Sequence, residues 1–161
     1  MRLVYQHTQI GYVNIIIVLM IFAIYVMILI SKADETPISL TSTRVFVPVS
    51  LLVVCGVLFS SLTITVDRNS LAWRFGPGPI RMSEALANIT NAKVSDVSMS
   101  EGLGIRQTSS GWLYNVGPGQ VVQIVLRDGR EIQLGTDDPT ALVSAIQAAG
   151  ARVEARRIIG K

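Results

Sequence analysis

The chain has 161 residues, of which 50% are hydrophobic, and carries a formal net charge of +3, one cysteine and one histidine. This apolar content is too high for an ordinary soluble domain of the same length. A single cysteine excludes an intrachain disulfide framework and a cysteine-rich zinc site. The small net charge, without a long basic stripe, argues against nucleic-acid binding.

The apolar residues concentrate in two runs near the N-terminus. The first, "YVNIIIVLMIFAIYVMILI", covers residues 12–30 without a charge, and Asn14 is its only strongly polar residue. Its helical length matches a hydrocarbon core of about 30 Å. The second, "VFVPVSLLVVCGVLFSSL", covers residues 45–62, with Pro48 in the first turn, where a missing N–H costs little. We therefore expect a membrane hairpin over residues 1–62, with a polar loop at 31–44.

A cleaved signal peptide is the alternative for the first run, since "SKA" at residues 31–33 has small residues at suitable offsets. The run is longer than a usual signal-peptide core, so a membrane span is favoured. Two spans place both termini on one side, and Lys and Arg are enriched in cytoplasmic segments. The terminal side has Arg2, Arg68, Arg74 and Arg81, against Lys32 and Arg44 in the loop, which predicts cytoplasmic termini.

Residues 63–150 are expected to form a mainly-β domain. "LTITVD" (62–67) and "LAWRFG" (71–76) alternate apolar and polar residues around a short turn, which is typical of a hairpin. "QVVQIVLRDGREIQLG" (120–135) predicts a second hairpin about Asp128-Gly129. Shorter strands are expected at 80–82, 92–99 and 111–116, and a helical turn at 83–89.

The domain is expected to end in a helix. In "TDDPTALVSAIQAAG", Asp138 is a suitable N-cap and Pro139 a suitable first helical residue, followed by an apolar stripe. A basic tail, residues 151–161, follows. About seven antiparallel strands are expected to close into a barrel, because free sheet edges promote aggregation. The helix would then plug an open end of that barrel.

This order of elements resembles the pleckstrin-homology-like (PH-like) fold, and the chain is similar to a bacterial family of membrane-anchored PH-like proteins. The resemblance is carried by "LTITVDRNSLAWRFGPG" after an apolar run, by "GIRQTSSGWLYNVGPG" and by "DGREIQLGTDDPTALVSAI". It implies a fold and a place in the bacterial inner (plasma) membrane, and it implies no activity. Lipid-binding PH domains hold inositol phosphates around the first hairpin loop, whereas "DRNS" offers Arg68 beside an acid.

A glycine-rich segment beside two aromatic residues holds the candidate contact residues. "GLGIRQ" (102–107) lacks the third glycine and the strand–helix unit of a dinucleotide-binding fingerprint. Arg106 is a candidate contact for a partner or ligand carboxylate or phosphate. The alternative, a tie from Arg106 to Asp137 or Asp138, is favoured.

Trp112 and Tyr114 are the other two candidate contacts. They are two residues apart in an expected strand, so they share one face of it. Packing in the wall of the barrel is favoured over a platform for a ligand, because aromatic side chains are usually buried.

No catalytic constellation is recognisable, since the only histidine and cysteine, His7 and Cys55, fall in the membrane part. We therefore expect a non-catalytic interaction or scaffold protein, without cofactor or metal, which contacts membrane lipid and a membrane-protein partner. An accessory subunit of a larger membrane complex is one version. A lipid or small-ligand binding module at the cytoplasmic membrane face is the alternative.

Overall fold

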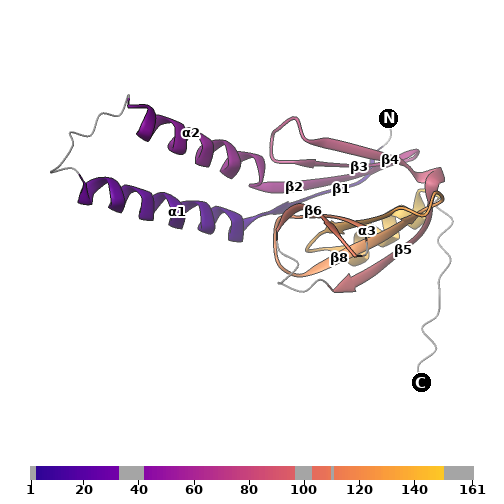
Figure 1. Cartoon of the computed structure of the whole chain (residues 1–161). Coiled ribbons are helices and arrows are strands. Elements are labelled where there is room, and N and C mark those ends of the chain that lie inside the picture. The colour runs from indigo at the N-terminus through magenta and orange to yellow at the C-terminus, as the bar shows by residue number, and fades with distance from the viewer. Residues whose placement is uncertain (1–2, 33–41, 97–102, 110, 151–161) are drawn as a thin grey trace, which may run out of the picture.

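Two stacked β-sheets form the body of the molecule, and two apolar helices extend from one end of it (Figure 1). The computed structural model describes residues 3–32, 42–96, 103–109 and 111–150. The elements are, in chain order, β1 (Leu3–Ile10), α1 (Tyr12–Ser31), α2 (Thr43–Leu58), β2 (Ser61–Asp67), β3 (Ser70–Phe75), β4 (Arg81–Ala85), a 3-10 turn η1 (Leu86–Asn88), β5 (Ile89–Asp96), β6 (Gly104–Thr108), β7 (Gly111–Asn115), β8 (Gln120–Leu126), β9 (Glu131–Gly135) and α3 (Pro139–Ala148).

The first sheet has the order β1-β2-β3-β4, and the second has the order β5-β8-β9-β7-β6. All pairings are antiparallel except β7 with β9, which is parallel. Strand β9 lies between β8 and β7. It runs antiparallel to β8 and in the same direction as β7. The described residues thus contain nine strands where the sequence predicted about seven antiparallel ones.

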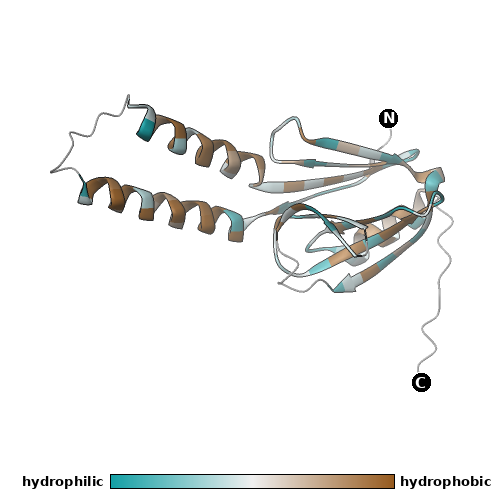
Figure 2. Cartoon of the chain, in the orientation of Figure 1, coloured by the Kyte–Doolittle hydropathy of each residue, from teal (hydrophilic) through white to brown (hydrophobic). Residues whose placement is uncertain are grey.

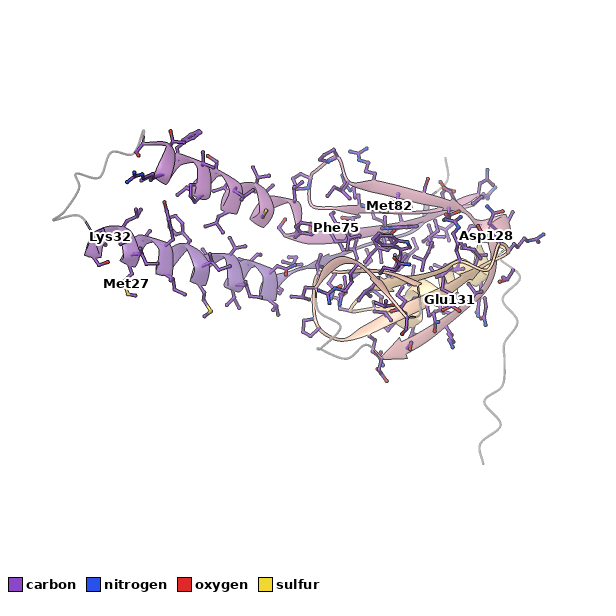
Figure 3. The ribbon with its side chains drawn as sticks, in the orientation of Figure 1. Met27, Lys32, Phe75, Met82, Asp128 and Glu131 are labelled. Atoms are coloured by element: carbon purple, nitrogen blue, oxygen red, sulfur yellow. The ribbon has the colours of Figure 1, made fainter. Side chains whose placement is uncertain are left out.

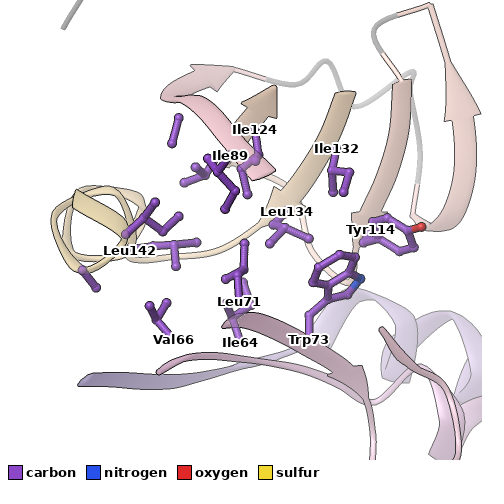
Figure 4. Close-up of a cluster of buried hydrophobic side chains, with 14 of the residues drawn as sticks. Ile64, Val66, Leu71, Trp73, Ile89, Tyr114, Ile124, Ile132, Leu134 and Leu142 are labelled. Carbon is purple, nitrogen blue, oxygen red and sulfur yellow. The ribbon is translucent and has the colours of Figure 1, made fainter. Parts of the chain in front are cut away.

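The expected closed barrel is wrong. Among the described strands no pairing joins the first sheet to the second, so the sheets stack as an open sandwich. Their inner faces share one core, into which α3 inserts Leu142 at one open side (Figure 4). Ile146 of α3 belongs to the same core. Helix α3 packs against β1 of the first sheet and against β5 and β8 of the second. The helix thus covers an open side, which removes the need for strands to close there.

The local predictions that rest on turns and caps are confirmed. Strands β2 and β3 form a hairpin, and β8 and β9 form another about Asp128-Gly129. The Asp138 side chain accepts a hydrogen bond from the N–H of Ala141 at 3.2 Å, and Pro139 begins α3. The predicted helical turn at 83–89 is shorter, since β4 continues to Ala85 before η1 begins. The basic tail, residues 151–161, lies outside the described residues.

The helices are inserted between two neighbouring strands of one sheet. Strand β1 pairs with β2 over its whole length, ending with Ile10 opposite Ser61. Residues 3–10, which the sequence placed with the membrane hairpin, are therefore an edge strand of the sandwich. The expected second span of residues 45–62 is also wrong in extent, because α2 ends at Leu58 and Ser61 already belongs to β2.

Only α1, among the described helices, is long and apolar enough to cross a membrane, with a mean hydropathy of 3.1. None of its residues is buried, and hydrophobic residues make up most of its ribbon (Figure 2). Helix α2 has 16 residues and lies beside α1. A helix that is apolar on all sides and exposed is suited to lipid rather than to water.

One polar side chain fixes the helices to the sandwich. The Nδ2 amide of Asn14 donates to the carbonyl oxygens of Phe59, at 3.1 Å, and of Val116, at 3.4 Å. Phe59 links α2 to β2, and Val116 follows β7. The one strongly polar residue of the first apolar run thus joins α1, the end of α2 and the second sheet.

Candidate functional site: a groove at the open side of the sandwich

The side of the sandwich opposite α3 is open and carries a groove of about 310 Å³. It lies between β4 of the first sheet and β7 and β9 of the second. Side chains from both sheets line it, among them Met82 and Glu131 (Figure 3). The lining residues are Trp73, Met82, Ser83, Glu84, Trp112, Tyr114, Arg130, Glu131 and Ile132.

Strand register brings these side chains to the groove. In the first sheet Trp73 is paired with Met82, so both point between the sheets. In the second sheet Trp112 is paired with Ile132 in the parallel β7–β9 ladder. Residues two apart in a strand share a face, so Tyr114 follows Trp112 into the same space. The prediction that these two aromatic side chains share one strand face is confirmed.

The two predicted aromatic residues have different environments. Tyr114 is 8% exposed and packs on Trp73, with ring centroids 5.3 Å apart at an angle of 57° (Figure 4). Trp112 is 45% exposed. Burial raises the pKa of the Tyr114 phenol, and the nearby Arg130 cation opposes that rise. Tyr114 therefore belongs to the core wall, whereas Trp112 offers an indole surface at the rim.

An ion pair closes one end of the groove. Arg130 Nη2 lies 3.2 Å from Glu84 Oε1, and Arg130 Nε lies 2.7 Å from Asp128 Oδ2. The Glu84 side chain is only 17% exposed, whereas Arg130 is 60% exposed. The pair connects β4 of the first sheet with the β8–β9 turn of the second. Glu84 is thus the carboxylate partner of the Arg130 cation at the groove.

The sequence did not point to this pair, because its members are 46 positions apart and only the strand order brings them together. Glu84 was expected in a helical turn. The one usable signal was its alternation with Met82, which is typical of a strand edge.

The floor of the groove contains an unsatisfied hydrogen-bond donor. Trp73 is 3% exposed, and its Nε1 atom is buried without a hydrogen-bond partner. Leaving such a donor unpaired costs about 1–3 kcal/mol, so a buried orphan N–H calls for an explanation. An acceptor that enters the groove beside Trp73 would satisfy it.

Arg106, the third predicted contact, is not at the groove. It is an exposed residue of β6, where it lies opposite Leu113 of β7. Both acids that the sequence proposed as partners of Arg106 have other contacts. Asp137 contacts His7, and Asp138 caps α3. Strand β6 is at the edge of the second sheet farthest from β5, against which α3 packs.

Comparisons with protein-family models, with curated proteins and with solved structures found no match. The chemistry of the groove itself must therefore indicate what it does. Within the described ranges, no three His, Cys, Asp or Glu side chains gather closely enough to hold a metal ion. The groove offers an N–H donor, an exposed indole and a fixed ion pair, which suit an apolar segment with carbonyl acceptors.

Proposed function

We propose that the chain is a non-catalytic, membrane-anchored PH-like interaction protein of a bacterial inner membrane. In this proposal the groove binds an extended segment of a membrane-protein partner, and the chain is an accessory subunit of the partner's complex. The observation that carries the proposal is the insertion of the two apolar helices between β1 and β2. This connection holds the groove at a fixed distance from the lipid. The PH-like assignment is supported by α3, which covers one open side between two sheets.

The pairing of β1 with β2 in the first sheet supports an uncleaved membrane anchor rather than a cleaved signal peptide. Strand β1 precedes α1 and forms seven register pairs with β2. Cleavage after α1 would remove this strand and expose the edge of β2, whose inner face holds Ile64 and Val66 of the core. A signal peptide does not normally contribute a strand to the mature fold.

The geometry of the helices supports a hairpin. Both leave the same end of the sandwich, since α1 follows the end of β1 and α2 precedes the start of β2 (Figure 1). A membrane crossed by both would leave the sandwich on one side. In the described residues Arg68 lies at the β2–β3 turn, away from the helices, so Arg74 and Arg81 balance Lys32 and Arg44. Arg2 adds a further cation on the terminal side, and we therefore propose cytoplasmic termini.

The strands that flank the groove support an extended partner. In the described pairings β4 pairs only with β3, and β6 pairs only with β7. Each has a free edge of backbone N–H and C=O groups, to which a strand of another protein can add. A carbonyl of such a strand would be a suitable acceptor for Trp73 Nε1.

Site-specific photocrosslinking tests the proposal. The full chain carries p-benzoylphenylalanine in place of Trp112, at the groove rim, or in place of Ser144, an exposed residue of α3. Irradiation of cells followed by purification in mild detergent is expected to give a discrete crosslinked protein from position 112 alone. Equal crosslinking from both positions, or a monodisperse uncrosslinked protein from both, contradicts the proposal.

A reporter fused after Lys161 tests the orientation. Green fluorescence is expected for a cytoplasmic terminus, whereas alkaline phosphatase activity reverses the proposed topology. Resistance of the chain to extraction by alkaline carbonate tests the anchor itself.

A further inference from the structure

Two arginines that form no ion pair with a described residue lie side by side on the outer face of the first sheet. Strand register places Thr8, Thr63, Arg74 and Arg81 in one row across β1, β2, β3 and β4. Arg74 is half-buried and Arg81 is exposed. Neither takes part in an ion pair within the described chain, where the cations of the pairs are His7 and Arg130. Like charges directly opposite each other destabilise a sheet, so this pair is suited to an anion between them.

The row borders a shallow depression of about 340 Å³. The side chains on its floor are small, because the next row of paired residues contains Thr65 and Ala72. The Thr63 hydroxyl adds hydrogen-bonding capacity, and it lies 2.9 Å from that of Thr8. Among the described residues that line the depression there is no carboxylate. Guanidinium groups beside hydroxyls form the usual setting for a phosphate group.

The row of Thr8, Thr63, Arg74 and Arg81 lies close to the apolar helices, which favours a lipid headgroup as the source of the phosphate. The β3–β4 turn touches the end of α2, because a Cβ added to Gly76 would lie 2.4 Å from the carbonyl oxygen of Val57. The Gly76 N–H also donates to the Ser61 carbonyl at 2.8 Å. Arg74 is two residues from Gly76, hence about 7 Å farther from the helices along the strand.

That height corresponds to lipid headgroups. The polar layer on each side of the hydrocarbon core is about 5–7 Å thick. With α1 across the core, the arginine side chains are long enough to reach phosphates at the interface. A free phosphate in solution would not need a site beside the membrane.

We propose that Arg74 and Arg81 form a binding site for the phosphate of an anionic phospholipid headgroup. This proposal rests on the membrane anchorage proposed above, and it is independent of the groove and its partner. The site fixes the tilt of the sandwich toward the membrane surface, because only one face of the first sheet carries it.

The test is a titration of the purified full chain in a non-ionic detergent with short-chain phosphatidylglycerol, followed by native mass spectrometry. Short-chain phosphatidylcholine is the lipid control. The variant Arg74→Gln/Arg81→Gln is expected to lower phosphatidylglycerol affinity about tenfold or more, because it removes charge-assisted hydrogen bonds. The single variants Arg74→Gln and Arg81→Gln are also measured, and Arg68→Gln is their matched control, since it removes one positive charge from the same sheet at the far turn. It is expected to change affinity less than about twofold.

Arg74→Lys/Arg81→Lys separates the geometry of the site from its charge. It is expected to give an intermediate loss, because lysine lacks the planar fork of arginine. Far-UV circular dichroism checks that each variant keeps its fold.

Three results would overturn the headgroup site. They are equal phosphatidylglycerol binding by the double glutamine variant and the unmodified chain, an equal loss in Arg68→Gln, and competition by inorganic phosphate at the same concentration as the lipid. Each leaves the crosslinking and carbonate-extraction tests unaffected, so failure of this site is distinguishable from failure of the proposed function.

Discussion

Gly111, the first residue of β7, is expected to be the glycine least tolerant of substitution. Its φ of 98° lies in a region that side-chain-bearing residues rarely adopt. A Cβ at this position would also lie 2.1 Å from the carbonyl oxygen of Glu131 in β9. Gly104, the first residue of β6, has a φ of 95° but nothing within 4 Å of its Cβ position. The two glycines therefore share a backbone conformation and differ in the space around it.

The magnitudes follow from this difference. Gly104→Ala requires only the left-handed conformation, so it is expected to lower the free energy of unfolding by about 1–2 kcal/mol. Gly111→Ala also forces β7 away from β9, in a ladder with three register pairs. Weakening two or three backbone hydrogen bonds adds about 1–4 kcal/mol. The total of about 2–6 kcal/mol is a large part of the stability of an ordinary domain.

Urea unfolding of the full chain in mild detergent, followed by far-UV circular dichroism, measures both variants. Circular dichroism is preferred to fluorescence because Trp112 is adjacent to the mutated residue. If Gly111→Ala loses no more stability than Gly104→Ala, the close approach of β7 and β9 is refuted, and with it the wall of the groove that Trp112 and Tyr114 form.

Three further predictions concern single side chains. Backbone N–H groups of Asn69 and Ser70 lower the pKa of Asp67, so its stabilising contribution is present above about pH 4 and is lost as the pH falls. Asp67→Asn should therefore reduce the fall in the free energy of unfolding between pH 6 and pH 2. Burial raises the pKa of Tyr114, so the unfolded chain ionises first and stability falls as the pH rises past about 10; Tyr114→Phe should reduce this alkaline loss in unfolding between pH 9 and 11. Asn14→Leu leaves the carbonyls of Phe59 and Val116 without their donor, at a cost of about 1–3 kcal/mol. It should speed amide hydrogen exchange at Gly11 at least about fivefold. Unchanged exchange would show that Asn14 does not fix the junction between the helices and the sandwich.

The parts of the fold that were predictable from the sequence are those with local causes. Asp128-Gly129 sets a hairpin within a few residues, and Asp138 with Pro139 sets the start of α3. Strand β1 had no such signal, because its inward-facing residues include His7 and Gln9, which interrupt the apolar alternation. Only its pairing with β2, across both apolar helices, makes it a strand.

The candidate site also has one part that was predictable from the sequence and one part that was not. The shared face of Trp112 and Tyr114 follows from their spacing in one strand. Their neighbours Glu84 and Arg130 come from different sheets, and no spacing in the sequence indicates that contact. The barrel was expected because free edges are unfavourable, but α3 covers one side and leaves β4 and β6 as edges on the other.

The division of the first sheet by the helices has a consequence for folding during synthesis. Strand β1 leaves the ribosome before α1 and α2, yet its partner β2 is separated from it by both apolar helices. Pairs formed late across a long stretch of chain are slow to form, because loop closure must precede them. The first sheet is therefore complete only after both helices and β2 have been synthesised. A chain in which β1 fails to pair would retain an unpaired β2 edge, which is a natural target for chaperones and proteases.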